Sequence, residues 1–130
     1  MFIFSDTATR IGLRGLFRVP QNYVGTAAVL VEWTSTATSG DREWDFDYRA
    51  VGGNDAESMD QAGTQESVNR NDTAPTATDR RLSFSLSLTS ANLVAGDLVE
   101  FELFRDGTDA GDTMAAAAVL FGAYFSYADA

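Results

Sequence analysis

The chain has 130 residues, a formal net charge of −10, and neither cysteine nor histidine. Without cysteine there are no disulfides, thiolate metal sites or cysteine nucleophiles, and without histidine there is no Ser-His-Asp triad. The strong negative charge disfavours binding to nucleic acid and to anionic membranes. This length suits one domain with its own core. We therefore expect a protein that is not an enzyme, needs no cofactor and does not enter a membrane.

Residues 1–20 are a basic beginning to an acidic chain. They carry three arginines against one aspartate, a formal charge of +2, which leaves about −12 for the remainder. Along residues 10–19, apolar side chains alternate with arginines, which predicts a strand that ends at Pro20. The apolar set is Ile11, Leu13, Phe17 and Val19, and the basic set is Arg10, Arg14 and Arg18.

Two interpretations of residues 1–20 stay open. The segment is either an edge strand whose arginines pair with internal carboxylates, or a contact segment that faces an acidic partner. Residues 1–4, which include Phe2 and Phe4, are in the same way either a first strand on the core or an arm that docks on a neighbour.

Two strands are predicted next, at residues 27–36 and 42–51. In the second, Trp44, Phe46 and Tyr48 alternate with charged residues, which indicates one buried and one wet face. A short turn joins the two strands, so we expect them to pair as an antiparallel hairpin. Inward parity also predicts that the aromatic side chains form the core rather than a carbohydrate groove. These are Trp33, Trp44, Phe46, Tyr48, Phe84 and Phe101.

A polar stretch at residues 52–79 separates these strands from the next. Gly, Asn, Asp and Pro break regular structure there, although residues 64–70 are a further candidate strand. The acidic residues Asp55, Glu57 and Asp60 fit a solvated loop. Residues 80–89 alternate again and predict a strand, and residues 89–93 have the pattern of a short helical turn.

Residues 97–127 predict a β-hairpin on which the rest of the chain is organised. The first arm, residues 97–105, alternates between apolar and acidic side chains, and residues 106–112 have the composition of a turn. The second arm, residues 113–127, is apolar on both faces and therefore has to be covered twice. We expect another copy of the chain to cover it through Met114, Leu120 and Tyr124.

The turn at residues 106–112 also offers a candidate cation site. Asp106, Asp109 and Asp112 could supply the hard oxygen ligands that Ca²⁺ prefers. The spacing is not that of an EF-hand, and Asp and Gly are what turns prefer for backbone reasons. A plain turn without metal is the favoured interpretation.

Taken together, these elements predict an all-β protein. The expected fold is an antiparallel β-sandwich of about six to eight strands, jelly-roll-like or immunoglobulin-like. Residues 21–130 are expected to form this single domain, and residues 1–20 to be its arm or its edge strand.

Two stretches of the sequence resemble a known group of proteins. One joins residues 29–33, through the turn at 37–41, to residues 44–49; the other runs from residues 93–106 into the final apolar strand. This pattern of strands and turns is similar to that of small β-sandwich proteins on the surface of tailed-bacteriophage virions, and most of all to capsid decoration (cement) proteins.

The resemblance implies a structural virion protein without enzymatic activity. Such a protein is expected to sit as a homotrimer on the outer capsid surface, to bind the major capsid protein and to stabilise the shell. The expected capsid contacts are Phe2, Phe4, Arg10, Arg14, Phe17 and Arg18. The alternative is a receptor-binding or fibre-tip module that recognises a host surface glycan.

Overall fold

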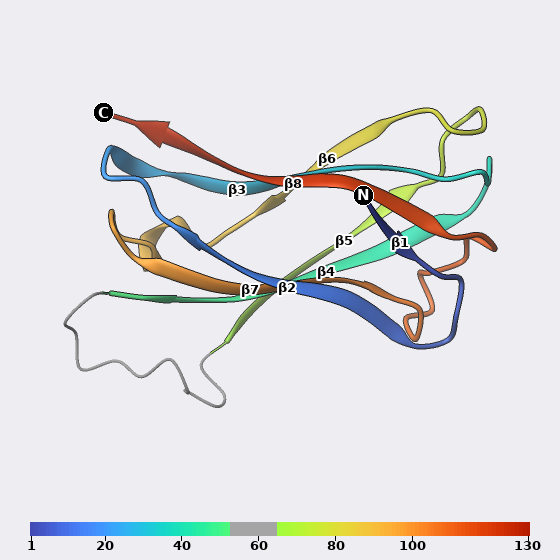
Figure 1. The fold of residues 1–130 in the computed structure, drawn as a ribbon, viewed down its shortest axis with the longest axis horizontal. Helices are drawn as coiled ribbons and strands as arrows, with labels where there is room; N and C mark the ends of the chain where they lie inside the picture. The colour runs from blue at the N-terminus through green and yellow to red at the C-terminus, as the bar shows by residue number, and fades with distance from the viewer. Residues whose placement is uncertain (53–64) are drawn as a thin grey trace.

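A computed structural model describes residues 1–52 and 65–130 of the chain. These residues form two four-stranded antiparallel sheets that face each other (Figure 1). The strands are β1 (Phe2–Phe4), β2 (Arg10–Arg18), β3 (Tyr23–Thr34), β4 (Asp41–Val51), β5 (Glu66–Thr73), β6 (Leu82–Ser87), β7 (Leu98–Asp106) and β8 (Ala118–Asp129), with a 3-10 turn at Ser90–Asn92. The prediction of an antiparallel β-sandwich of six to eight strands is confirmed.

The order of the strands is that of a jelly roll. The first sheet has the order β1-β8-β3-β6 and the second the order β2-β7-β4-β5. The pairs β1 with β8, β2 with β7, β3 with β6 and β4 with β5 are nested, as in one long antiparallel ribbon rolled into two layers.

Both predicted hairpins are wrong in their pairing. β3 and β4 lie in different sheets, and so do β7 and β8, although each strand is close to its predicted position. A short polar connection can close a hairpin within one sheet or arch over to the opposite sheet, and the alternation along each strand is the same in both cases. β8 also begins at Ala118, because the residues after the turn at 106–112 are used to cross between the sheets.

The core lies between the two sheets and is rich in aromatic side chains. Trp33 of β3 and Trp44 of β4 are both fully buried and meet edge to face, with ring centroids 5.6 Å apart. The inward parity predicted for the aromatic residues is therefore confirmed for most of them; Phe101 is only partly buried. Trp33, Trp44, Tyr48 and Phe84 fill the interior and do not form an open carbohydrate groove.

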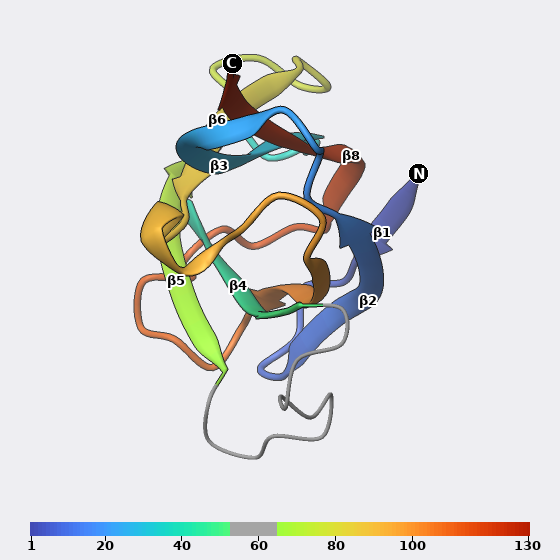
Figure 2. The ribbon, with the colours of Figure 1, turned by 90° about the vertical axis from the view of Figure 1, so that its left-hand side faces the viewer.

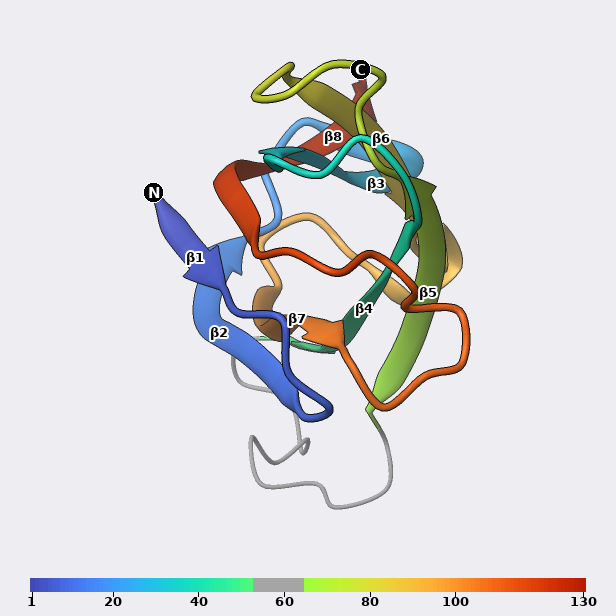
Figure 3. The same ribbon diagram turned by 90° about the vertical axis from the view of Figure 1, so that its right-hand side faces the viewer.

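Residues 1–18 supply an edge strand to each sheet. β1 pairs with β8 in the first sheet, and β2 pairs with β7 in the second. The two strands lie on the same side of the sandwich (Figures 2 and 3). Phe4 is 2% exposed and packs edge to face against Trp44, with ring centroids 5.4 Å apart. Phe4 is therefore a core residue and is not free to contact a capsid, which corrects the prediction for this position.

The different positions of the two β1 phenylalanines give a matched test. We expect Phe4→Ala to lower the free energy of unfolding by about 3 kcal/mol, because it leaves a cavity beside Trp44. Phe2 is 57% exposed, so Phe2→Ala is expected to cost less than about 1 kcal/mol. Denaturant unfolding of both variants measures the difference, and equal costs would contradict the core position of Phe4.

Candidate functional site

The two long sides of the sandwich are built differently. On the side of β5 and β6, Arg70 Nη1 donates to the carbonyl oxygen of Ser85 at 3.1 Å and links the two sheets. On the opposite side, β1 and β8 face β2 (Figure 2). There β1 pairs only with Ala118, Val119 and Leu120 of β8. Within the described part of the chain, residues 122–129 of β8 therefore have no strand partner on that side.

A cavity of about 200 Å³ opens between β8 and β2 on this side. Four phenylalanines line it together with Leu16, Val29, Ala123 and Tyr124. The ring of Phe17 on β2 lies 4.8 Å from that of Phe125 on β8, so these two rings bridge the sheets. Phe101 and Phe46 continue the floor as a stacked pair at 5.3 Å. The cavity is thus an apolar hollow with an aromatic floor.

Exposed apolar side chains occur on the three strands of this side, and Leu16 and Tyr124 among them line the hollow. Phe2, Ile3, Leu16, Phe121 and Tyr124 are between 44% and 64% exposed. We call this region the open-edge surface: β1, residues 121–129 of β8, and residues 14–18 of β2. No charged residue occurs from residue 115 to residue 128. Exposed edge strands of natural proteins usually carry charges or proline that prevent further pairing, so an uncharged apolar edge indicates a binding surface.

The arginines of β2 differ in the number of ion pairs that they form within the chain. Arg10 lies within 3.5 to 3.8 Å of the carboxylates of Asp45, Asp47 and Asp106 and covers the ring of Phe104. Arg14 Nε donates to Glu102 at 3.1 Å on the surface. Arg10 and Arg14 thus behave as the edge-strand interpretation expects, because both pair with carboxylates of their own chain. Arg18 forms no ion pair with any residue in the described ranges, so its charge is available to a partner.

The self-association prediction needs correction at two of its three residues. Met114 is 1% exposed and Leu120 is 2% exposed, so both are buried by their own chain and offer no surface to another copy. The prediction assumed that the segment was one strand with two faces to cover. Instead, Met114 belongs to the crossing between the sheets, and Leu120 faces the core. Tyr124 is 52% exposed, as the prediction requires.

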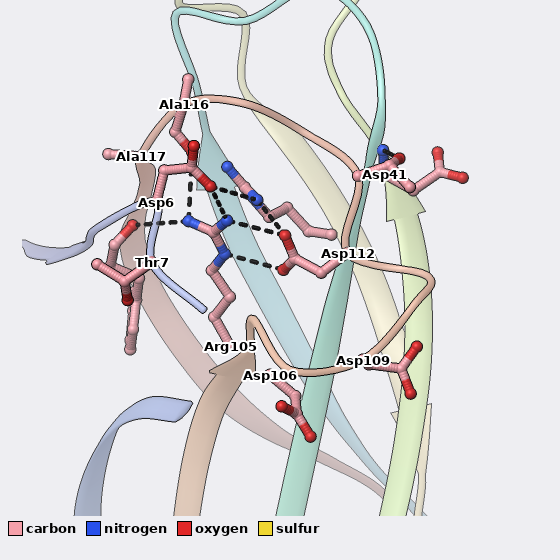
Figure 4. A network of polar contacts seen from close by, with 12 residues as sticks. Asp6, Thr7, Asp41, Arg105, Asp106, Asp109, Asp112, Ala116 and Ala117 are labelled. Carbon is pink, nitrogen blue, oxygen red and sulfur yellow. Dashed lines mark hydrogen bonds and ion pairs between the residues drawn. The ribbon is translucent and has the colours of Figure 1, made fainter. Parts of the chain in front are cut away.

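The carboxylates of the turn after β7 do not converge on a common point. Asp106 accepts from the backbone of Thr108 and Asp109 from that of Gly111, as turn residues do. The Asp112 side chain is 2% exposed and points instead to arginine (Figure 4). Figure 4 shows that the three carboxylates point in different directions, so the proposed Ca²⁺ ligand set is not formed.

Asp112 is the centre of a buried ionic network. Arg105 donates to its two carboxylate oxygens at 2.8 Å through Nε and Nη2, and Arg42 Nη1 donates to the same carboxylate (Figure 4). Arg105 Nη2 also donates to Asp6 at 2.6 Å, and its Nη1 donates to the carbonyl oxygen of Ser5 at 2.6 Å. Both guanidinium groups are almost completely buried. The network therefore ties β4, β7, the segment before β2 and the crossing to β8 together.

Arg42 and Arg105 are not among the residues predicted from the sequence, although their parity indicates them. Arg42 shares the inward face of β4 with Trp44, and Arg105 is the register partner of Trp44. An arginine at an inward position of a strand is a signal for a buried ion pair, because a lone buried charge is too costly. Nε and Nη2 of Arg42 have no hydrogen-bond partner among the described residues.

We expect Asp112→Asn to destabilise the protein strongly. The substitution leaves two buried guanidinium groups with only the half-exposed Asp6 to balance them, at a cost of about 3 kcal/mol or more. The control is Asp129→Asn, which makes the same change on an exposed residue at the end of β8 and is expected to shift stability by less than about 0.5 kcal/mol. Denaturant unfolding at constant pH compares the two, and a loss below about 1 kcal/mol for Asp112→Asn would contradict the role of the network.

A second electrostatic feature lies on the outer face of β4. Glu43 is 5% exposed, and burial together with the neighbouring Asp109 raises its pKa to about 7. Burial and the nearby Asp106 raise the pKa of Asp45 to about 6, although Arg10 opposes the rise. Both carboxylates therefore take up protons in the folded state near neutral pH, where the unfolded chain has released them.

These raised pKa values predict that the protein is more stable at pH 5 than at pH 8. Between about pH 4.5 and 7 the folded state binds more protons than the unfolded state, so the free energy of unfolding falls as pH rises. Glu43→Gln should stabilise the protein at pH 8 by on the order of 1 kcal/mol and flatten this dependence. The exposed Glu100→Gln is the matched control for charge, and an identical pH profile for both variants would contradict the assignment to Glu43.

The comparisons with known proteins add no relative. No protein-family model, no curated protein and no solved structure matches the chain. In the described ranges, no helix is long and apolar enough to cross a bilayer. Residues 1–52 and 65–130 also hold no group of three or more acidic side chains arranged to bind a metal ion. Asp55, Glu57 and Asp60 lie outside the described residues.

Proposed function

We propose that this chain is a non-enzymatic structural protein of a tailed-bacteriophage virion, a decoration protein that binds the major capsid protein on the outer capsid surface and stabilises the shell. The observation that carries the proposal is the open-edge surface: an uncharged apolar strand edge beside Arg18, which has no ion pair within residues 1–52 and 65–130, on a chain whose net charge is −10. Such a surface favours a protein partner over nucleic acid or an anionic membrane.

The fold is compatible with this proposal but does not decide it. Jelly rolls are frequent in viral capsid and lectin domains, and the same fold carries many unrelated functions. The sequence resemblance to decoration proteins gives the specific direction. The proposed capsid contacts on the open-edge surface are Phe2, Phe17, Arg14 and Arg18, which the sequence predicted, together with the exposed Leu16 and Phe121.

The energetics favour several weak contacts over one strong contact. Burial of Phe2 or Leu16 against a partner contributes roughly 1.5 to 3 kcal/mol for each side chain that is fully covered. A surface ion pair of Arg18 adds only about 0 to 1 kcal/mol. Stable attachment to a shell is therefore expected to use avidity, and the proposal includes a homotrimer. Tyr124 stays a proposed contact of this trimer, and Ile3, which is also exposed on the first sheet, replaces the buried Met114 and Leu120.

The direct test is association with virions. We expect mass spectrometry to find the chain in purified particles of the phage that encodes it. Purified protein should rebind to capsids stripped of it, in a sedimentation assay. A Phe2→Ser and Leu16→Ser double variant should lose most of this binding, whereas Val94→Ser, which changes an equally exposed residue outside the surface, should bind normally. A chain that is absent from virions and does not sediment with capsids is not a decoration protein.

One observation favours the alternative of a glycan-recognition module. Tyr124, which lines the cavity, is half exposed, and so is Phe121 earlier in β8; exposed aromatic rings can stack on sugars. A glycan array distinguishes the two functions: glycan binding that Tyr124→Ala abolishes, without affinity for capsids, would replace the decoration proposal. Normal capsid binding without any glycan signal would exclude this alternative.

A further inference from the structure

We propose that the free edge of β8 at residues 122–129 accepts an extended segment of another protein as an additional strand of the first sheet. The segment carries apolar side chains at alternate positions and at least one carboxylate. This assigns a mode of binding to the open-edge surface and identifies the chemistry of what binds there. It does not depend on whether that partner is a capsid.

The pairing of the first sheet determines the form of the occupant. β8 pairs with β3 along almost its whole length, from Thr34↔Val119 to Tyr23↔Asp129. On its other side β1 reaches only to Phe2↔Leu120 (Figure 1). The remaining stretch therefore presents backbone N–H and C=O groups to an incoming strand, collinear with β1 and just beyond its first residue. Main-chain pairing of this kind supplies affinity without requiring a particular sequence.

The cavity determines the side chains of the occupant. Ala123 and Phe125 of β8 line it, and both lie on the inner face of the first sheet opposite Val31 and Val29. A strand paired with this stretch of β8 directs every second side chain to the same inner face, toward the hollow. With a volume of about 200 Å³ and an aromatic floor, the hollow suits one large aliphatic or aromatic side chain.

Charge selects a different protein as the occupant over a second copy of this chain. A second β8 paired at this edge would bring no charged side chain from its residues 122–128, so it offers no ion pair to the arginines of β2. Leu16 lies at the cavity, and Arg14 and Arg18 follow on the same face of β2, two residues to either side of it. Arg14 is 77% exposed and Arg18 is unpaired within the described ranges. A carboxylate on the incoming segment is complementary to this basic rim.

The β5 and β6 side shows what a protected edge looks like in the same molecule. β5 includes the charged residues Glu66, Arg70 and Asp72, and the Arg70 side chain donates a hydrogen bond to the carbonyl oxygen of Ser85 on β6. Charges and a cross-sheet hydrogen bond therefore guard that side against an added strand. Residues 122–128 of β8 carry no charged side chain, and no hydrogen bond within the described part of the chain links them to β2.

Selection of peptides on the purified chain tests the proposal without any assumption about the virion. The probe is a displayed library of random peptides of about 12 residues, long enough to cover the free edge. We expect enrichment of sequences with an apolar residue at every second position and an acidic residue at one end. Hydrogen–deuterium exchange with the selected peptide should slow at residues 122–128 of β8.

Two substitutions with matched controls localise the binding. Ala123→Trp fills the cavity and should lower the affinity for the selected peptide by about tenfold or more. Val94→Trp, on the connection before β7, should leave this affinity unchanged. Arg18→Glu should lower the peptide affinity about fivefold at low salt, whereas Arg81→Glu, next to β6, should not change it. The charge variant keeps the test informative if the tryptophan variant fails to fold.

The proposal is overturned if no peptide is enriched over a control protein, or if protection appears away from β8. It is also overturned if the chain alone forms a dimer that protects residues 122–128, because the occupant would then be a second copy. Peptide binding at this edge without any binding to capsids would reject the decoration function and leave this inference standing.

Discussion

The buried network of Arg42, Arg105, Asp112 and Asp6 is the constraint on which the arrangement of the sandwich depends. Buried charges are tolerated only when each has an opposite charge and hydrogen bonds that replace water. Here that requirement brings together groups from β4, from the end of β7 and from two connections between the sheets. A hydrophobic contact at this place could slide, but a bidentate pair such as Arg105 with Asp112 holds the segments in one geometry.

This constraint also determines where the open edge lies. Arg105 donates to the carbonyl oxygen of Ser5 and to Asp6, which holds the chain directly after β1. Phe4 is thereby placed against Trp44, and β1 pairs with the first three residues of β8. β1 has only three residues, so among the described residues the rest of β8 has no strand partner on that side. The contacts of Arg105 with Ser5 and Asp6 therefore determine both the buried ionic network and the position of the open-edge surface.

Sequence alone located the strands well but could not assign them to sheets. Alternation along residues 10–18 and 82–87 indicated both the strands and their buried faces, because a strand with one wet face has period two. Along residues 42–51 it located the strand, but the wet face that it predicted is wrong, because Glu43 and Asp45 are buried. Which strands pair depends on whether a connection stays in its sheet or crosses to the other, and that is decided by contacts between residues far apart in the chain. Ser35, for example, donates to the carbonyl oxygen of Ala117 across the connections at one end.

The same limit applied to the candidate site. The apolar character of residues 113–127 was visible in the sequence, but it combined three roles that composition does not separate. Met114 belongs to a crossing segment, Leu120 to the core, and Phe121 and Tyr124 to the surface. The opening between β8 and β2 depends on how far β1 extends along β8, and the sequence of residues 1–4 contains no signal for that register. By contrast, the inward parity of Arg42 was a usable sign of the buried network.

An uncharged edge strand needs protection from pairing with other copies of itself, and the rest of the molecule supplies it. Opposite Glu32 and Trp33, β8 carries one extra residue at Phe121, a bulge that interrupts the regular ladder at the start of the free edge. A second β8 also brings no charged side chain from residues 122–128 to the arginines of β2. A segment that brings a carboxylate to Arg18 gains an ion pair that a second β8 does not offer. The surface therefore selects by local charge as well as by apolar burial, because the attraction to Arg18 acts on approach whereas apolar burial acts only on contact.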